Sequence, residues 1–399
     1  MTFSTRTAWE LTENALTQRL RERRERGGEV LDLTVSNPTA CGFRYDANDL
    51  LSPLSQPAAL IYDPQPFGLA SARAAVAEYY RDHNADIPIE NICLTTSTSE
   101  AYSYLFRLLC DPGDEILIAR PSYPLFAFIA QLDSVRLREY PLQYDPGASH
   151  TSPHAWTIDL DALRASITPR TRALIVVHPN NPTGNYASAA EREALESLCT
   201  EHSLALIVDE VFLDYPISPS THPHTFAAAN SSALTFVLSG ISKVCALPQM
   251  KLSWIVIPPA ASGPNPLLQQ ALARLEVIAD TFLSVNAPTQ AALPHWLAHR
   301  STIQNQIRER VVRNLAALDR RLHNSRSSTA QRLALEAGWT AVLRVPRTIE
   351  GQPFAEAALD HGVLLQPGEF YGLPEGRAVL SLLTPPESFD AGLKHLPID

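Results

Sequence analysis

A lysine is the residue of this chain best suited to covalent chemistry. Of the 32 basic residues only three are lysine, Lys243, Lys251 and Lys394, which leaves 29 arginines (32 − 3). Lys243 stands in SGISK, shortly after the apolar segment 234–238, which has the composition of a buried strand. A lysine in that position, in a chain that otherwise avoids lysine, is hard to explain as a solvent-exposed surface residue. Its primary amine could form a Schiff base with a carbonyl compound.

Polar and aromatic residues follow four further segments that also have the composition of buried strands. In an open parallel sheet, ligands bind at the carboxyl ends of the strands, where the loops converge. We therefore expect these residues and Lys243 to lie close together. In chain order they are Ser97, Thr98 and Ser99 after 92–96, Tyr123 after 115–119, Asn181 after 173–177, and Asp209 after 205–208.

These side chains match the requirements of pyridoxal phosphate (PLP) chemistry. The cofactor needs a lysine for an internal Schiff base and a carboxylate that keeps its pyridine nitrogen protonated as an electron sink. It also needs donors at a helix N-terminus for the phosphate, an aromatic face for the ring and an amide near the ring hydroxyl. Lys243, Asp209, the 97–99 segment, Tyr123 and Asn181 supply one of each.

Each of these features except Lys243 also fits a purely structural role. Asp209 could cap a helix, and the 97–99 segment could do the same. The NPTG sequence that contains Asn181 is a plausible turn, and Tyr123 could be half-buried packing between prolines. The combination of the residues, in this order, carries the prediction.

The longer segments around these residues resemble fold-type I PLP-dependent aminotransferases of the class I/II family. The strongest matches are HPNNPTG, VDEVF and SGISKVCALPQMK, in that order and spacing. Tyr62, Gly68 and Arg73, in YDPQPFGLASAR, match a Tyr…Gly…Arg segment of the family. CDPGDEILIARPSYP and VLLQPGEFYG match two further segments. The resemblance covers nearly the whole chain.

The resemblance implies a role for each candidate residue. Lys243 would hold the cofactor and move the proton at the substrate Cα, and Asp209 would pair with the pyridinium nitrogen and raise its pKa. Asn181 would hydrogen-bond the ring hydroxyl, and Tyr123 would stack on the ring. The cofactor phosphate would be held by Thr98, Ser99 and Lys251, and Ser97 and Ser242 would also contact the cofactor.

Further contacts follow from the same resemblance. Tyr62 would reach the phosphate bound by the neighbouring subunit, so the protein would be an obligate homodimer with shared active sites. Ser36 and Asn37 would contact the substrate. No metal is expected.

Two cofactor positions depart from the family pattern. Phe212 stands where most members have a tyrosine that donates to the ring hydroxyl. Its absence should raise the pKa of the Schiff base with Lys243. Lys251 stands where most members have an arginine. Lysine keeps the positive charge but loses the bidentate fork that suits phosphate.

The substrate end departs more strongly. The family places an arginine that binds the substrate α-carboxylate two residues before a serine in a strand near the C-terminus. Here GRAVLSLL has Val379 at that position and Arg377 two residues earlier. Residues two apart share a face of a strand, so Arg377 could reach the same site or could be a strand-edge surface residue.

Six strand-like apolar segments, the five given above and 252–257, alternate with helical patterns along the first two thirds of the chain. The alternation predicts an α/β fold with a mostly parallel sheet flanked by helices, and the resemblance implies seven strands in that sheet and a smaller α+β domain. We expect the large domain at 46–289 and the small domain at 1–45 and 290–399. The helical patterns are 69–84, 99–109, 188–202, 267–285 and 302–323.

Charge and cysteine content exclude several classes of function. The 42 acidic residues outnumber the basic ones and give a formal net charge of −10, which disfavours nucleic acids and anionic membranes as partners. The five cysteines are scattered without CxxC spacing, so neither a disulfide framework nor structural zinc is expected. No segment approaches the roughly 20 apolar residues of a membrane span. We expect a soluble cytoplasmic protein.

The sequence therefore predicts a PLP-dependent aminotransferase that moves an amino group between an amino acid and a 2-oxo acid by a ping-pong Schiff-base mechanism. The changes at Phe212 and Val379 leave open a PLP-dependent β-eliminating C–S lyase acting on a cysteine-like substrate. A third class is a non-catalytic sensor that keeps PLP as a ligand. The 45 residues that precede the large domain are too short and insufficiently basic for the DNA-binding domain of such regulators.

Overall fold

A computed structural model describes residues 2–149, 151, 153–218, 224–228, 233–259, 265–325 and 330–398. Its largest element is an eight-stranded sheet with the strand order β2-β9-β8-β7-β6-β3-β4-β5. All six segments expected to form strands are in it. The strands are β2 (Ile92–Thr95), β3 (Glu115–Arg120), β4 (Arg136–Tyr144), β5 (Trp156–Ile158), β6 (Thr171–Val177), β7 (Ala205–Asp209), β8 (Thr235–Gly240) and β9 (Ser253–Val256).

The sheet is mostly parallel, as expected, and has one strand more than the seven predicted. β3, β4, β6, β7 and β8 pair in parallel, whereas β9 lies antiparallel between β2 and β8. The two strands that no expected segment covers are β4 and the short β5, which pairs antiparallel with β4 at the edge of the sheet. The α/β fold class is confirmed.

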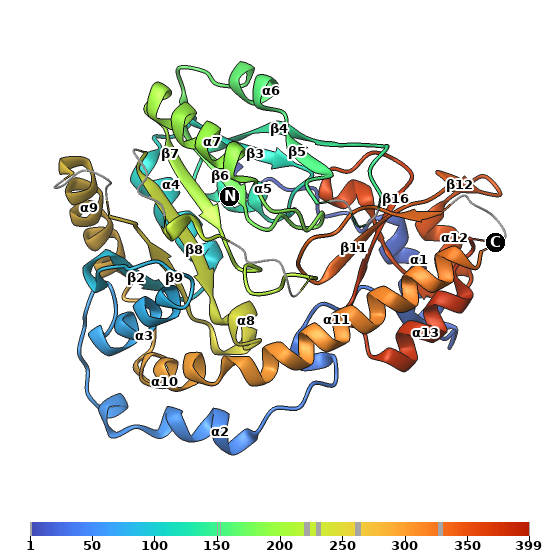
Figure 1. Ribbon diagram of the computed structural model, residues 1–399, viewed down its shortest axis with the longest axis horizontal. Helices are drawn as coiled ribbons and strands as arrows, with labels where there is room; N and C mark the ends of the chain where they lie inside the picture. The colour runs from blue at the N-terminus through green and yellow to red at the C-terminus, as the bar shows by residue number, and fades with distance from the viewer. Residues whose placement is uncertain are drawn as a thin grey trace.

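Helices cover both faces of this sheet (Figure 1). Leu174 and Leu206 pack with helices α3, α7 and α10 on one face, and their neighbours Ala173 and Ile207 pack with α4, α5 and α9 on the other. Alternate residues of each strand thus enter different apolar layers, which explains the nearly continuous apolar strand sequences. These helices are α3 (Ala70–Arg81), α4 (Thr98–Leu109), α5 (Phe126–Leu132), α6 (Leu160–Ala165), α7 (Ala189–His202), α9 (Pro266–Phe282) and α10 (Ala287–Ala298).

A second, antiparallel sheet with the order β10-β11-β16-β15 lies in the C-terminal part of the chain. Its strands pack with three helices around a separate apolar cluster that contains Trp339, Leu380 and Phe389. The elements are α11 (Arg300–His323), β10 (Gln331–Arg332), β11 (Thr340–Arg344), β12 (Thr348–Ile349), β13 (Gln352–Pro353), α12 (Phe354–Asp360), β14 (Val363–Leu364), β15 (Gln366–Pro367), β16 (Arg377–Ser381) and α13 (Pro386–His395).

The N-terminal segment joins this second part of the fold. The short strand β1 (Leu31–Asp32) pairs in parallel with β14, and helix α1 (Ala15–Glu25) contacts α12. Arg19 of α1 forms ion pairs with Glu356 and Asp360. Helix α2 (Ala47–Leu51) lies on the segment of the chain that leads from β1 to the first strand of the large sheet.

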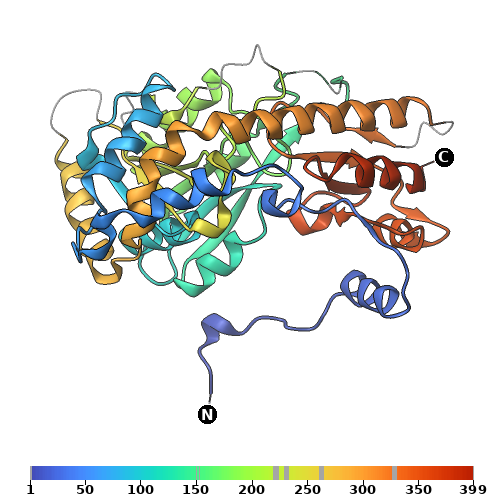
Figure 2. The ribbon, with the colours of Figure 1, turned by 90° about the horizontal axis from the view of Figure 1, so that it is seen from below.

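The long helix α11 connects the two parts (Figure 2). Near its start, Gln304 donates to the carbonyl of Val244 beside the large sheet, and further along Asn314 donates to the carbonyls of Leu382 and Thr384. The boundary expected at 289/290 stays a prediction; α10, which spans it, packs with the large sheet. No helix among the described residues is long and apolar enough to cross a membrane.

Candidate active site

A cavity of about 540 Å³ lies at the carboxyl ends of the central strands, where the second sheet approaches the first. Ten of the thirteen residues predicted from the sequence line it. They are Ser36, Ser97, Thr98, Ser99, Tyr123, Asn181, Asp209, Ser242, Lys243 and Lys251. Residues separated by more than 200 positions in the chain thus meet in one cavity.

Lys243 is delivered to the cavity by the short helix α8 (Ile241–Val244), which starts directly after β8. The turn requires glycine at position 240, because a Cβ there would lie 2.2 Å from Oγ of Ser253 on the adjacent strand. The hydroxyl of Tyr215 donates to the carbonyl of Lys243 at 2.7 Å. Burial lowers the pKa of the Lys243 amine, and the charge of Asp209 opposes this. Burial has the larger effect, so the pKa is lowered, which favours the neutral, nucleophilic form of the amine.

Two aromatic rings stand beside the lysine amine. Nζ of Lys243 lies 5.6 Å from the centroid of the Phe212 ring and 5.2 Å from the centroid of the Trp339 ring. The two rings pack edge to face at 5.3 Å. Phe212 comes from the segment after β7, whereas Trp339 immediately precedes β11, so both parts of the fold form this wall.

Asp209 is the last residue of β7 and is buried beneath the cavity. Burial raises the pKa of its carboxyl group to about 6, although two hydrogen bonds and the charge of Lys243 act in the opposite direction. The donors are the backbone N–H of Val211 at 3.1 Å and the hydroxyl of Tyr102 at 3.0 Å. The side chain is therefore fixed in orientation, as a carboxylate that pairs with a ring nitrogen must be.

The start of α4 forms the polar end of the cavity. Ser97 is the N-cap residue, and its Oγ accepts a hydrogen bond from the backbone N–H of Glu100 at 3.2 Å. Ser97 therefore caps the helix, which is the structural role that the sequence also allowed for it. Thr98 and Ser99 are the first residues of the helix and line the cavity. The exposed N–H groups and dipole of a helix N-terminus favour an anion there. Lys251 lines the same cavity, with its backbone in the left-handed region at φ 52°.

Asn181 and Tyr123 complete the set from adjacent loops. Oδ1 of Asn181 is buried and has no hydrogen-bond partner among the described residues. The neighbouring Asn180 holds the loop in place through bonds from Nδ2 to the carbonyl of Pro121 and to Oγ1 of Thr183. An amide whose oxygen has no partner in a cavity is a position for a ligand.

Three predicted residues lie outside the cavity lining. Asn37 caps a short helical turn, with its side-chain oxygen accepting from the N–H of Thr39. Arg377 is half-buried on β16, and its Nη1 donates to the carbonyl of Gly376 at 2.9 Å. Tyr62 is 82% exposed and lines a different cavity.

Comparisons with known proteins bear on what this cavity does. The chain matches the family model "Aminotransferase class I and II" over residues 54–394. The chain belongs to the class I and II aminotransferase family. It is an aminotransferase, and members of this family depend on PLP.

Named relatives are similarly classified. Over 285 residues, 71% of this aminotransferase and 67% of the relative, the chain is 30% identical to the glutamate-pyruvate aminotransferase AlaA of Escherichia coli K12. Over 92% of this chain and 87% of the relative, it is 26% identical to the arginine–pyruvate transaminase AruH of Pseudomonas aeruginosa. Its fold resembles that of an alanine aminotransferase from Pyrococcus furiosus, with a TM-score of 0.85, 21% identity and 99% and 98% of the two chains covered. All three are aminotransferases, and nothing in the comparisons favours a C–S lyase.

Several residues that line the cavity of the aminotransferase were missed from the sequence. Tyr102 lies in the middle of α4, where its hydroxyl becomes significant only because the helix packs over Asp209. Trp339, Gln366 and Tyr371 come from the C-terminal part and reach the cavity through tertiary packing. Gln366 and Tyr371 had a sequence signal, because both belong to the VLLQPGEFYG segment, whereas Trp339 had none.

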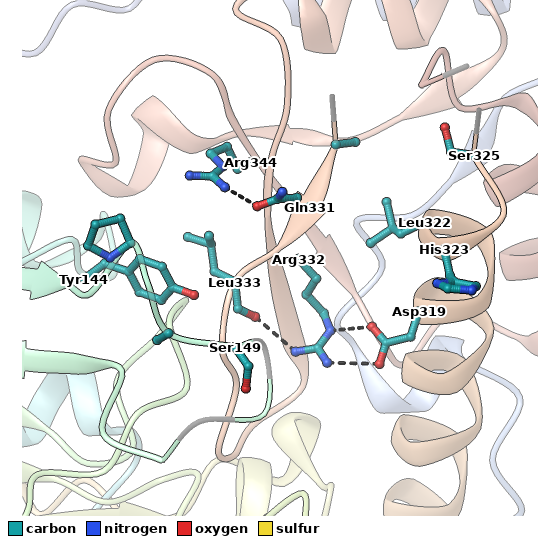
Figure 3. A pocket seen from close by; sticks show the side chains of 13 residues that line it. Tyr144, Ser149, Asp319, Leu322, His323, Ser325, Gln331, Arg332, Leu333 and Arg344 are labelled. Carbon is teal, nitrogen blue, oxygen red and sulfur yellow. Dashed lines mark hydrogen bonds and ion pairs between the residues drawn. The ribbon is translucent and has the colours of Figure 1, made fainter. Parts of the chain in front are cut away.

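A second cavity of about 450 Å³ lies between Tyr144 at the end of β4 and the α11–β10 region (Figure 3). Arg332 there pairs with Asp319, and Arg344 donates to Gln331. None of the residues predicted from the sequence lines it. Ten of them line the cavity that contains Lys243.

Proposed function

We propose that the cavity around Lys243 binds PLP and transfers an amino group from an amino acid to a 2-oxo acid in two half-reactions. The observation that carries this proposal is the convergence of a buried lysine amine, the fixed carboxylate of Asp209 and the unpartnered oxygen of Asn181. A lysine, an acid and an amide at one rim are the groups that this cofactor requires.

The residues present fit the aromatic end of the cofactor. The carboxylate of Asp209 would accept from a protonated ring nitrogen, a pairing that lowers the pKa of the acid and keeps the nitrogen charged. Tyr123, which packs edge to face on Phe126 at 6.1 Å, would lie against the ring. The side-chain amide of Asn181, whose Oδ1 has no partner among the described residues, would hydrogen-bond the ring hydroxyl. That hydrogen bond would also fix which way the amide group points.

The other end of the cavity fits a phosphate. Thr98 and Ser99 at the start of α4 supply hydroxyls and backbone donors, and Ser97, Ser242 and Lys251 complete the polar rim. The charge of Lys251 would balance the phosphate together with the helix N-terminus.

Lys243 has two tasks in this proposal. Burial favours its neutral amine, which would hold the cofactor covalently through the aldehyde carbon, with loss of water. Once released by the substrate amine, the same Nζ is free to take the proton from the substrate Cα and return it as a general base and acid. The bound cofactor supplies the electron sink that makes the Cα proton acidic.

For the substrates, we infer that alanine and pyruvate are one exchanging pair. The relatives named above include a glutamate-pyruvate aminotransferase and an arginine–pyruvate transaminase, and the structural neighbour is an alanine aminotransferase. Ser36 of the N-terminal segment lines the cavity and would contact the substrate. The other two substrate candidates from the sequence are Asn37, next to Ser36 in the chain, and Arg377, two residues before Val379.

We also infer a homodimer. Leu60, Ile61 and Tyr62 are consecutive apolar or aromatic residues, with exposed fractions of 89%, 67% and 82%. Such exposed apolar segments mark association surfaces. In the proposed dimer Tyr62 would reach the phosphate end of the partner cavity. All five cysteines are free thiols, in keeping with the reducing cytoplasm as the place of action.

The test of the proposed function uses Lys243→Ala. The purified wild-type protein should show a visible absorbance band of bound cofactor, and incubation with alanine and 2-oxoglutarate should produce pyruvate. The variant should lose the band and the activity. A variant that keeps both the band and undiminished activity would contradict the role of Lys243 and the proposed function. Pyruvate formed from a cysteine-like substrate without an acceptor would instead favour the lyase.

A further inference from the structure

The ring of Trp339 forms a wall of the cavity directly beside the lysine amine. The side chain is 1% exposed, and Nζ of Lys243 lies 5.2 Å from its centroid. Phe212 stands at a similar distance, 5.6 Å. Aromatic side chains therefore occupy the space next to the atom at which the chemistry takes place.

The ring is held rigidly by its surroundings. It packs edge to face on Phe212 at 5.3 Å and on Tyr215 at 4.9 Å. Its backbone carbonyl accepts from the N–H of Leu382 at 2.7 Å, and the hydroxyl of the next residue, Thr340, donates to the carbonyl of Pro182 at 3.1 Å. None of the described residues accepts a hydrogen bond from the indole N–H, so packing alone fixes the ring.

This position constrains the substrate. A substrate whose Cα exchanges a proton with Nζ of Lys243 must place that carbon within reach of the amine, and its side chain then projects into the surrounding space. A rigid indole beside the amine reduces that space, because close-packed interiors do not yield to added volume.

We propose that Trp339 is a specificity-determining residue that makes this aminotransferase discriminate against amino acids with a bulky aromatic side chain, so that it takes alanine before phenylalanine. The inference rests on the proposed function. It is independent of how the substrate carboxylate is bound, because it concerns only the volume beside Cα.

The experiment compares kcat/KM for alanine and phenylalanine, each with 2-oxoglutarate, in the wild type and in Trp339→Ala. The ratio of phenylalanine to alanine should rise by about 10- to 100-fold in the variant, the range that side-chain size differences produce in an apolar pocket. Trp339→Phe keeps an aromatic wall and gives up only an N–H that has no partner. Its ratio should stay much closer to that of the wild type than the ratio of Trp339→Ala.

Trp156→Ala is the matched control. Trp156 is also buried, and its indole N–H likewise has no partner among the described residues, but it packs on Tyr144 away from the cavity lining. Its loss should leave the substrate ratio unchanged. If Trp339→Ala fails to fold, Trp339→Leu fills part of the space and should still shift the ratio toward phenylalanine.

The outcomes separate this inference from the proposed function. A wild type that transaminates alanine, with folded Trp339 variants that keep the wild-type ratio, would overturn the role of Trp339 alone. A wild type that transfers no amino group from any amino acid would overturn the proposed function and the inference with it. An equal shift of the ratio in Trp156→Ala would also overturn the inference, because the effect would not be specific to the wall.

Discussion

The hydroxyl of Tyr102 donates a hydrogen bond to Oδ2 of Asp209 at 3.0 Å, between helix α4 and the sheet. Both side chains are buried, so the phenol takes the place of water as a partner of the carboxylate. Together with the N–H of Val211, it lowers the pKa of Asp209 against the larger effect of burial. Tyr102 is therefore a positioning residue that helps to keep Asp209 ionised.

Tyr102→Phe should shift the pH dependence of the aminotransferase. Without the phenol, burial is less opposed and the pKa of Asp209 rises above about 6. Pairing with the cofactor ring nitrogen lowers this pKa in the loaded enzyme, but loss of the phenol still raises it relative to the wild type. The acidic limb of the kcat profile should therefore move to higher pH by up to about one unit, with kcat at pH 8.5 nearly retained. Tyr104→Phe removes a hydroxyl from the same helix, bonded to Ser284, and should leave the profile in place. Coincident profiles for the wild type and Tyr102→Phe would contradict this role.

Phe212→Tyr should lower the pH at which the absorbance of the bound cofactor changes. Phe212 lines the cavity beside Lys243, and the added hydroxyl would be a donor to the ionised ring oxygen, which stabilises the charged form. We expect a downward shift of about one unit, measured by titrating the visible spectrum. A shift upward would show that the hydroxyl instead adds desolvation without reaching the ring.

Lys251 should contribute to cofactor affinity mainly through its charge. Lys251→Ala removes the cation from the phosphate end of the cavity, and the dissociation constant of PLP should rise by about 10- to 100-fold, the equivalent of about 1.4 to 2.8 kcal/mol. Lys251→Arg keeps the charge and adds a fork, so its affinity should stay within a few-fold of the wild type. The measurement is titration of the cofactor-free protein by fluorescence. Equal affinities for all three proteins would remove Lys251 from the phosphate site.

Arg377→Ala distinguishes the two roles left open by the sequence. An arginine that binds the substrate carboxylate would, on removal, raise KM for alanine by roughly 10- to 100-fold. In the structure Arg377 donates to the carbonyl of Gly376, and burial, together with the charge of Arg344, lowers the pKa of its guanidinium. We therefore expect a change in KM of less than about threefold, measured against Ser36→Ala as a variant within the cavity. A tenfold rise would restore Arg377 as the carboxylate ligand.

Much of the site was predictable because its residues directly follow strands. The loop after β6, the end of β7 and the start of α8 carry Asn181, Asp209 and Lys243 in segments where local sequence sets both the turn and the chemistry. The same locality explains why the six apolar strands were found. β4 was missed because its sequence, RLREYPLQY, is not a continuous apolar run: most of its residues are exposed and three are charged, as befits a strand near the edge of the sheet.

The remaining residues could not be found because they depend on packing between distant segments. Trp339 lies 96 positions (339 − 243) after Lys243, and only the docking of the second sheet brings its ring to the amine. The sequence could not decide whether Arg377 reaches the cavity. Alternation along β16 gives the face of the strand on which Arg377 lies, but its distance from the cavity depends on the register between β16 and β11.

Glu210, next to Asp209, should make the stability of the protein fall as pH rises. Its carboxyl group is buried, and burial raises its pKa from 4.5 to about 7 despite hydrogen bonds from Thr225 and the N–H of Phe226. Below pH 4.5 the group is protonated in both folded and unfolded chains, and above pH 7 it is ionised in both. Between these values the folded chain holds a proton that the unfolded chain has released, so stability declines across the window by about 3 kcal/mol.

Glu210→Gln removes this titration while keeping a neutral side chain of the same shape. The free energy of unfolding of the variant minus that of the wild type should therefore increase by about 3 kcal/mol between pH 4.5 and pH 8. Urea titrations of the cofactor-free protein across this range provide the measurement, with Glu193→Gln as an exposed control on α7. A difference between variant and wild type that stays constant with pH would mean that Glu210 titrates alike in both states. A difference of the opposite slope would mean that its hydrogen bonds outweigh burial and that the folded protein favours the carboxylate.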